Sequence, residues 1–133
     1  MGKITEATVE KAGSYFEKKY NCCESVFHAC AEDLGLPLND TVKKMATAFG
    51  GGFGGSGCSC GALTGGILVI GALEGRCDPT AESKDPAYAK SKALTEKFKE
   101  RFGKTCCRSL KKEGRTVCKT YVQGVVSILS EIL

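Results

Sequence analysis

Residues 49–75 read FGGGFGGSGCSCGALTGGILVIGALEG, and this stretch decides the fold of the chain. It joins a glycine-rich loop to an uncharged segment, Ala62 to Leu73, that is apolar on all sides. Such a segment is typical of a helix buried at the centre of a domain. Residues Ile67 to Ile70 alone would also suit a buried strand. The apolar pattern continues to helical length on both sides, however, so we predict a helix.

Three helices are expected before the glycine-rich loop. They cover about Thr5–Tyr20, Asn21–Leu34 and Asn39–Phe49. The last two begin with asparagine, a good N-cap residue, and Gly35 ends the second. The side chains expected to face the core are Val9, Ala12, Phe16, Tyr20, Cys22, Val26, Phe27, Cys30, Leu34, Val42, Met45, Ala46 and Phe49.

Two more helices are expected after the apolar segment. One begins with Asp85 as N-cap and Pro86 in its first turn, and ends at Gly103; the other covers about Thr116–Ile132. Their expected core-facing residues are Ala87, Ser91, Leu94, Phe98, Phe102, Cys118, Val122, Val125 and Leu129. We therefore predict a single all-α domain over residues 1–133, a compact bundle of about five to six helices in which a glycine-rich loop leads into a buried central helix.

Cysteine is the outlier in composition. Nine of the 133 residues are cysteines, an odd number, so they cannot all pair with one another. The first residues are charged and do not resemble a signal peptide, and the longest apolar run, Gly61–Leu73, is short of the roughly 20 residues that span a bilayer. These features predict a cytoplasmic protein that does not enter membranes. In that compartment, cysteines hold metals or do redox chemistry more often than they form structural disulfides.

Basic residues concentrate in one part of the chain. Between Lys84 and Lys119 there are twelve Lys and Arg residues against four Asp and Glu residues, although the net charge is only +4. This pattern is typical of a solvated helix surface, and it would also suit a docking face for an acidic redox partner. The absence of interleaved aromatic residues disfavours nucleic-acid binding. A homodimer is compatible with the sequence, but no feature of it requires one.

Cys60 stands where the glycine-rich loop meets the apolar helix. Glycine permits positive φ and lets successive backbone N–H groups approach an anion or a thiolate sulfur. Because a helix N-terminus favours the thiolate, we expect a lowered pKa for Cys60, and likewise for Cys22 at the start of the second helix. The loop lacks the Gly-Lys-Ser/Thr ending of a P-loop and follows no strand, which disfavours nucleotide binding.

The remaining cysteine pattern excludes several familiar sites. No Cys-x-x-Cys is present, which counts against thioredoxin-type sites, zinc ribbons and bacterial ferredoxins. His28 is the only histidine, and we expect it to be a partly exposed helix residue rather than a ligand, so any metal site must rely on thiolates. In the doublets Cys22-Cys23 and Cys106-Cys107, adjacent side chains on a helix point about 100° apart, so we expect one functional member of each.

Four segments of the chain resemble the C_GCAxxG_C_C family, small proteins described as redox-active. The segments are NCCESV, FGGGFGGSGCSCGALTGG, FGKTCCRSL and the late Cys118; the family motif Cys-Gly-Ala-x-x-Gly stands here as CGALTG, residues 60–65. The resemblance covers the chain from about residue 15. Matched by position, the four family cysteines are Cys22, Cys60, Cys107 and Cys118, and the resemblance implies that they converge in space. The additional cysteines are Cys23, Cys30, Cys58, Cys77 and Cys106, and whether Cys58 or Cys106 substitutes for its neighbour stays open.

The resemblance implies redox activity. Because four thiolates are the ligand set that iron–sulfur clusters require, our first expectation is a cluster held by these four cysteines, in an electron carrier. Loop glycines, Gly57 and Gly61 among them, would supply backbone N–H groups to the cluster. The alternative is a thiol–disulfide oxidoreductase or redox sensor in which Cys60 attacks and Cys107 resolves, with Cys58 or Cys118 as other resolving candidates. A structural zinc or soft-metal site is a third reading. A helical interaction domain with incidental cysteines is the fourth.

Overall fold

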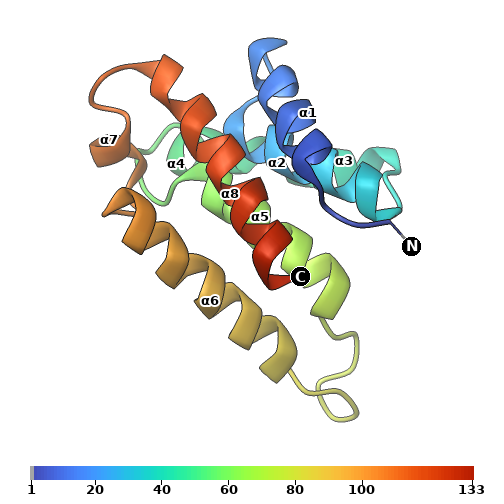
Figure 1. Ribbon diagram of the computed structural model, residues 1–133. Helices are drawn as coiled ribbons and strands as arrows, with labels where there is room; N and C mark the ends of the chain where they lie inside the picture. Colours follow the sequence, from blue (N-terminus) through green and yellow to red (C-terminus); the bar gives the residue numbers. More distant parts are fainter. Residues whose placement is uncertain (1) are drawn as a thin grey trace.

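The computed structural model describes residues 2–133, and over these residues the chain is helical with no strand (Figure 1). Five helices have twelve or more residues, which confirms the predicted all-α bundle and its approximate helix count. The elements in chain order are α1 (Glu6–Glu17), α2 (Cys22–Leu34), α3 (Asp40–Met45), the 3₁₀ turn η1 (Thr47–Phe49), α4 (Gly50–Phe53), α5 (Gly61–Glu74), α6 (Asp85–Phe102), α7 (Cys107–Leu110), the 3₁₀ turn η2 (Arg115–Val117) and α8 (Cys118–Ile132).

Helix α5 occupies the middle of the bundle, in contact with α2, α6 and α8, while α1 packs on α2 and α8 (Figure 1). Glycines on α5 allow this close approach. A Cβ atom at Gly65 would lie 2.9 Å from the carbonyl oxygen of Cys23 on α2, and one at Gly66 would lie 2.7 Å from a methyl of Val125 on α8. The fully buried Val69 and Ile70 continue this interface along α5. The glycines of the motif therefore serve packing as well as the loop.

Helix α2 begins and ends where its sequence predicts. The Asn21 side chain accepts a hydrogen bond from the backbone N–H of Glu24, and the Glu24 carboxylate accepts one from the backbone N–H of Asn21. This capping box fixes the first turn, and Gly35, with φ of 73°, ends the helix in the left-handed conformation. Cys22 is therefore held at a well-defined helix start.

Some expected core residues are exposed. Helix α1 ends at Glu17 because Lys19 takes φ of 80°, which leaves Tyr20 beyond the helix and 38% exposed. The third predicted helix is interrupted: α3 ends at Met45, whose side chain is 54% exposed, and a separate 3₁₀ turn continues to Phe49. A short helix at the edge of the bundle has no neighbour to cover both of its faces.

Two other burial predictions also need correction. Helix α5 is central but not enclosed, since Ile67 remains 36% exposed and Ala72 lies on the surface. His28 is buried rather than partly exposed, with its Nε2 atom 3.4 Å from the carbonyl oxygen of Lys43. The N-cap of α6 is Lys84, one residue before the predicted Asp85. Among residues 2–133, no helix combines the length and apolar character needed to cross a membrane.

Candidate functional site

Four cysteines from four separate segments line one small cavity. They are Cys22, Cys60, Cys107 and Cys118, and the wall is completed by Gly61, Leu110, Lys111 and Tyr121. Each cysteine stands at a helix start: three are the first residues of α2, α7 and α8, and Cys60 is the N-cap of α5. The positive ends of the long helices α2, α5 and α8 therefore converge on the same cavity. Taken alone, these helix ends favour negative charge near the sulfurs, an effect that burial of the thiols opposes.

A short backbone pairing brings Cys60 and Cys107 together. An isolated antiparallel bridge joins Ser59 to Cys106. The backbone N–H of Cys60 donates to the carbonyl of Thr105 at 2.7 Å, and the N–H of Cys107 donates to the carbonyl of Cys58. The end of the glycine-rich loop is thereby held in register with the residues that enter α7.

Glycine is required at specific points around the cavity. Gly61 lines it, and a Cβ atom there would collide with the Sγ atom of Cys22. Gly52 has φ of 73°, and a Cβ atom there would lie 2.7 Å from the Cβ of Cys107. Gly57 does not line the cavity; its carbonyl oxygen instead accepts hydrogen bonds from the backbone N–H of Arg108 and the thiol of Cys106. The loop is thus folded tightly onto α7.

Burial raises the pKa of three of the four cavity thiols, Cys60, Cys107 and Cys118. Burial raises the pKa of Cys60 to about 12, and the neighbouring thiols Cys22 and Cys107 also raise it. The N–H groups of Leu63 and Ala62 at the start of α5 lower it, but by less. The predicted lowering of the Cys60 pKa by the helix N-terminus is therefore wrong, because desolvation of a thiolate outweighs that effect.

Cys107 and Cys118 follow the same rule. Burial raises the pKa of Cys107 and of Cys118, and in each case the nearby Cys22 contributes in the same direction. Lys111 opposes the increase at both. Without a bound cation, burial therefore favours the protonated thiol over the thiolate at Cys60, Cys107 and Cys118.

The space around the sulfurs has two parts. The inner cavity is about 10 Å³, which is room for about one water molecule. A second hollow of about 120 Å³ lies against Cys22, Cys107 and Cys118 on another side, where Gly51, Lys111 and Arg115 also line it. Among residues 2–133, no three His, Cys, Asp or Glu side chains are placed to hold a metal ion directly in this structure. Metal binding would require the thiol side chains to turn.

The other five cysteines lie outside the cavity. Cys23 and Cys30 are buried in the core, where burial raises the pKa of each to about 12. Cys58, Cys77 and Cys106 are exposed. Hydrogen bonds from the backbone and side chain of Ser109 lower the pKa of Cys106. In each doublet, one member therefore lines the cavity while the other lies elsewhere.

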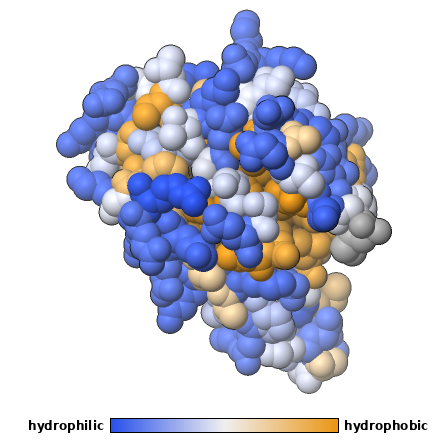
Figure 2. Space-filling view, viewed as in Figure 1, coloured by the Kyte–Doolittle hydropathy of each residue, from blue (hydrophilic) through white to orange (hydrophobic). Residues whose placement is uncertain are grey.

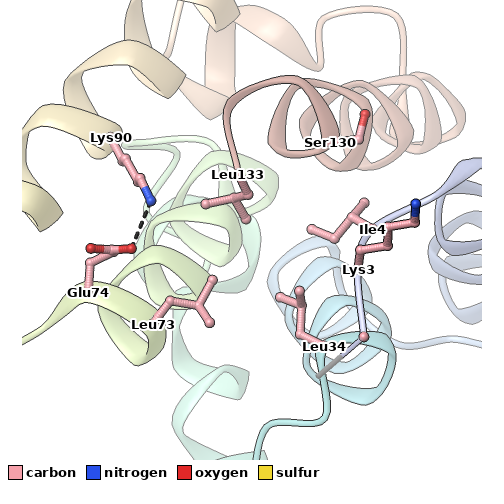
Figure 3. A pocket seen from close by; sticks show the side chains of 9 residues that line it. Lys3, Ile4, Leu34, Leu73, Glu74, Lys90, Ser130 and Leu133 are labelled. Carbon is pink, nitrogen blue, oxygen red and sulfur yellow. Dashed lines mark hydrogen bonds and ion pairs between the residues drawn. The ribbon is translucent and has the colours of Figure 1, made fainter.

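A further pocket of about 410 Å³ lies near the far end of α5 from the cysteines (Figure 3). Apolar side chains of Ile4, Leu34, Leu73 and Leu133 line it, and Figure 2 shows apolar surface gathered near the C-terminal end of α8. Lys90 and Glu74 form an ion pair at its edge with an N–O distance of 2.7 Å. None of the nine cysteines lines this pocket.

Comparison with known proteins shows which family the chain belongs to. Residues 20–132 match the family described as "Putative redox-active protein (C_GCAxxG_C_C)". The chain belongs to this family. The four cysteines around the cavity are those that the family pattern had indicated by position in the sequence. An uncharacterized protein of Archaeoglobus fulgidus is 34% identical to this C_GCAxxG_C_C protein over 122 residues, which cover 81% of each chain. No solved structure matches the chain.

Proposed function

We propose that this C_GCAxxG_C_C protein binds an iron–sulfur cluster through Cys22, Cys60, Cys107 and Cys118 and transfers electrons. The observation that carries the proposal is the shared cavity, which four cysteines from distant segments line at four helix starts. Four cysteine thiolates are the ligand set of the common clusters. When bound, the cluster would supply one-electron redox chemistry that the side chains lack.

The electrostatics of the cavity support a metal centre over a dithiol active site. A catalytic thiol needs a lowered pKa, whereas burial raises the pKa of Cys60 to about 12. A bound metal replaces the thiol protons and removes the cost of burying thiolates without a counter-charge. The helix N-termini and the ammonium group of Lys111 would then stabilise the remaining negative charge.

The space at the site accommodates a cluster if the side chains turn outward. The hollow of about 120 Å³ touches Cys22, Cys107 and Cys118, and Gly51 contributes no side chain to it. Cys60, the fourth ligand, lines the smaller cavity that borders the same three cysteines. That smaller cavity, at about 10 Å³, instead favours a single ion, so a zinc site with four thiolate ligands is the second candidate.

The surface next to the site suits an acidic electron-transfer partner. From residue 104 to residue 115 the exposed charged residues include only one acid, Glu113; the exposed basic residues are Lys104, Arg108, Lys111, Lys112 and Arg115. Lys111 and Arg115 also line the outer hollow. A partner with acidic side chains would therefore be attracted to the side of the protein that is nearest the proposed cluster.

Serine substitution tests the ligand assignment. Protein is purified without oxygen, or reconstituted with ferrous iron and sulfide, and its visible spectrum, iron, zinc and sulfide are measured. We expect charge-transfer absorption in the wild type and its loss in Cys22→Ser, Cys60→Ser, Cys107→Ser and Cys118→Ser. Cys77→Ser is the matched control, because Cys77 is exposed and far from the cavity lining.

The results of these measurements distinguish an iron–sulfur cluster from a zinc site and from dithiol chemistry. Colourless protein with one tightly bound zinc would replace the cluster with the zinc site. Metal-free protein that gains a disulfide at Cys60 on mild oxidation would favour dithiol chemistry. Circular dichroism of each variant shows whether a lost spectrum reflects lost ligands or lost folding.

A further inference from the structure

The hydroxyl group of Tyr121 joins two of the helices that carry cavity cysteines. Tyr121 lies on α8, and its hydroxyl donates a hydrogen bond of 2.7 Å to the carbonyl oxygen of Leu110, the last residue of α7. Carbonyl groups at the end of a helix have no partner within that helix, so this bond fills a position that α7 leaves open. We call this bond the tie between α7 and α8.

The tie lies about one helical turn beyond a cysteine on each helix. On α7, Cys107 precedes Leu110 by three residues. On α8, Cys118 precedes Tyr121 by three residues. Side chains three residues apart lie on the same face of a helix. The tie therefore acts on the spacing between Cys107 and Cys118.

The connection between the two helices has little packing of its own. Residues 111–116 are all exposed. A segment with few buried contacts opens locally at a low free-energy cost. The start of α7, by contrast, is held by backbone hydrogen bonds from Cys107 and Arg108 to the glycine-rich loop. The tie supplies a second fixed point, at the other end of α7.

The Tyr121 ring also forms part of the cavity wall. Tyr121 and Leu110 line both the four-cysteine cavity and a surface pocket of about 420 Å³. They therefore stand between the sulfurs and solvent on that side. Two aromatic neighbours hold the ring, whose centroid is 5.0 Å from that of Phe102 and 6.2 Å from that of the fully buried Phe98.

We propose that Tyr121 is a positioning residue of the four-cysteine site. Its hydroxyl fixes the spacing of Cys107 and Cys118, and its ring keeps water in the surface pocket away from the sulfurs. Protein groups that hold metal ligands in place typically change metal affinity by about 10–100-fold when they are lost. That consequence rests on the proposed function. The tie itself needs no metal, because both of its partners are protein groups.

Alkylation of fully reduced, metal-free protein tests the tie. Iodoacetamide is added, and fragment spectra of timed samples distinguish Cys107 from Cys106. Tyr121→Phe keeps the ring and loses the hydroxyl. Cys107 should then react about fivefold faster than in wild type, which is the effect of one net hydrogen bond on an opening equilibrium.

Tyr15→Phe is the matched control for the lost hydroxyl. The Tyr15 hydroxyl donates to the Glu32 carboxylate at 2.6 Å, and neither residue lines the four-cysteine cavity. This variant should leave the Cys107 rate unchanged. Equal Cys107 rates in Tyr121→Phe and wild type would overturn the tie.

Tyr121→Ala tests the part played by the ring. It opens the wall between the cavity and the surface pocket, so Cys60 should react at least about tenfold faster than in Tyr121→Phe. Circular dichroism shows whether the variant is folded. An unchanged Cys60 rate in folded Tyr121→Ala would overturn the exclusion of water by the ring.

Cobalt(II) is the probe for the placement of the sulfurs, because its visible spectrum reports how many thiolates coordinate it. We expect Tyr121→Phe to bind cobalt at least about tenfold more weakly than wild type, with a changed thiolate charge-transfer band. Tyr15→Phe should match wild type. Equal affinity and an unchanged band in Tyr121→Phe would overturn the positioning role. Wild type that binds no cobalt would count against the proposed metal centre, and the alkylation rates would still decide the tie.

Discussion

The inner and outer sides of the bridge between the glycine-rich loop and α7 present the same thiol group in opposite environments. Cys60 is 5% exposed and its pKa is raised to about 12 by burial, although it stands at the N-cap of a long helix. Cys106 is exposed at the start of a four-residue helix, and hydrogen bonds from Ser109 lower its pKa. The comparison indicates that burial outweighs position at a helix start in setting the pKa of these two thiols.

The largest expected effect is the difference in alkylation rate between these two thiols. A pKa of about 12 in place of 9.0 reduces the thiolate fraction of Cys60 by about a thousandfold at neutral pH. The more basic thiolate is also the stronger nucleophile, which offsets part of this difference, so Cys106 should react at least about thirtyfold faster than Cys60 with iodoacetamide in reduced, metal-free protein. Peptide mass spectrometry of timed samples measures both rates together. Comparable rates would mean that the cavity is open or that its thiols are ionised.

Much of the fold, but less of the site chemistry, could be predicted from the sequence. The capping box at Asn21 and the glycine at position 35 act within a few residues, so the limits of α2 were accessible. The exposure of Met45 and the burial of His28 depend on which helices cover them, and local pattern does not contain that information. The bridge between Ser59 and Cys106 was not predicted, since its residues are distant in sequence and neither segment has a strand pattern.

The four-cysteine site was also predicted in part: the cysteines that line the cavity were predicted, but the pKa of Cys60 was not. The resemblance to the family implied that Cys22, Cys60, Cys107 and Cys118 converge, and they line one cavity. The direction of the Cys60 pKa shift was wrongly predicted, because the sequence indicates the helix start but not the extent of desolvation. Only the three-dimensional packing decides which of these two opposing effects is larger.

A second test of the comparison adds a methyl group on the cavity side of the bridge, next to Cys22. In Gly61→Ala the new Cβ would collide with the Sγ of Cys22, whereas in Gly71→Ala, on the same helix, it would meet nothing within 4 Å. We expect Gly61→Ala to lower the free energy of unfolding by about 1–3 kcal/mol. The control Gly71→Ala should raise it by up to about 1 kcal/mol. Urea unfolding of the metal-free proteins measures both, and equal effects would contradict the close packing around Cys22.

The smallest expected effect is a change in the pKa of Cys106, the exposed thiol of the bridge. The Arg108 backbone and charge favour the Cys106 thiolate less than Ser109 does. Arg108→Gln removes the charge and the hydrogen bond that Nη2 donates to the carbonyl of Ser56, but it keeps the backbone N–H. The pKa of Cys106 should therefore move upward, and its alkylation should require higher pH. The rate of Cys106 alkylation as a function of pH is the measurement. Arg76→Gln is the matched control, and a profile that moves equally in both variants would show that net charge, not the local contact, sets the pKa.

The central claim is that the inner four cysteines hold a redox metal centre. It is tested most directly by measuring iron and acid-labile sulfide per chain in protein purified without oxygen. The account predicts both, in similar molar amounts, together with visible charge-transfer absorption. Protein that contains neither iron nor sulfide, and in which all nine cysteines titrate as free thiols after unfolding, would contradict it.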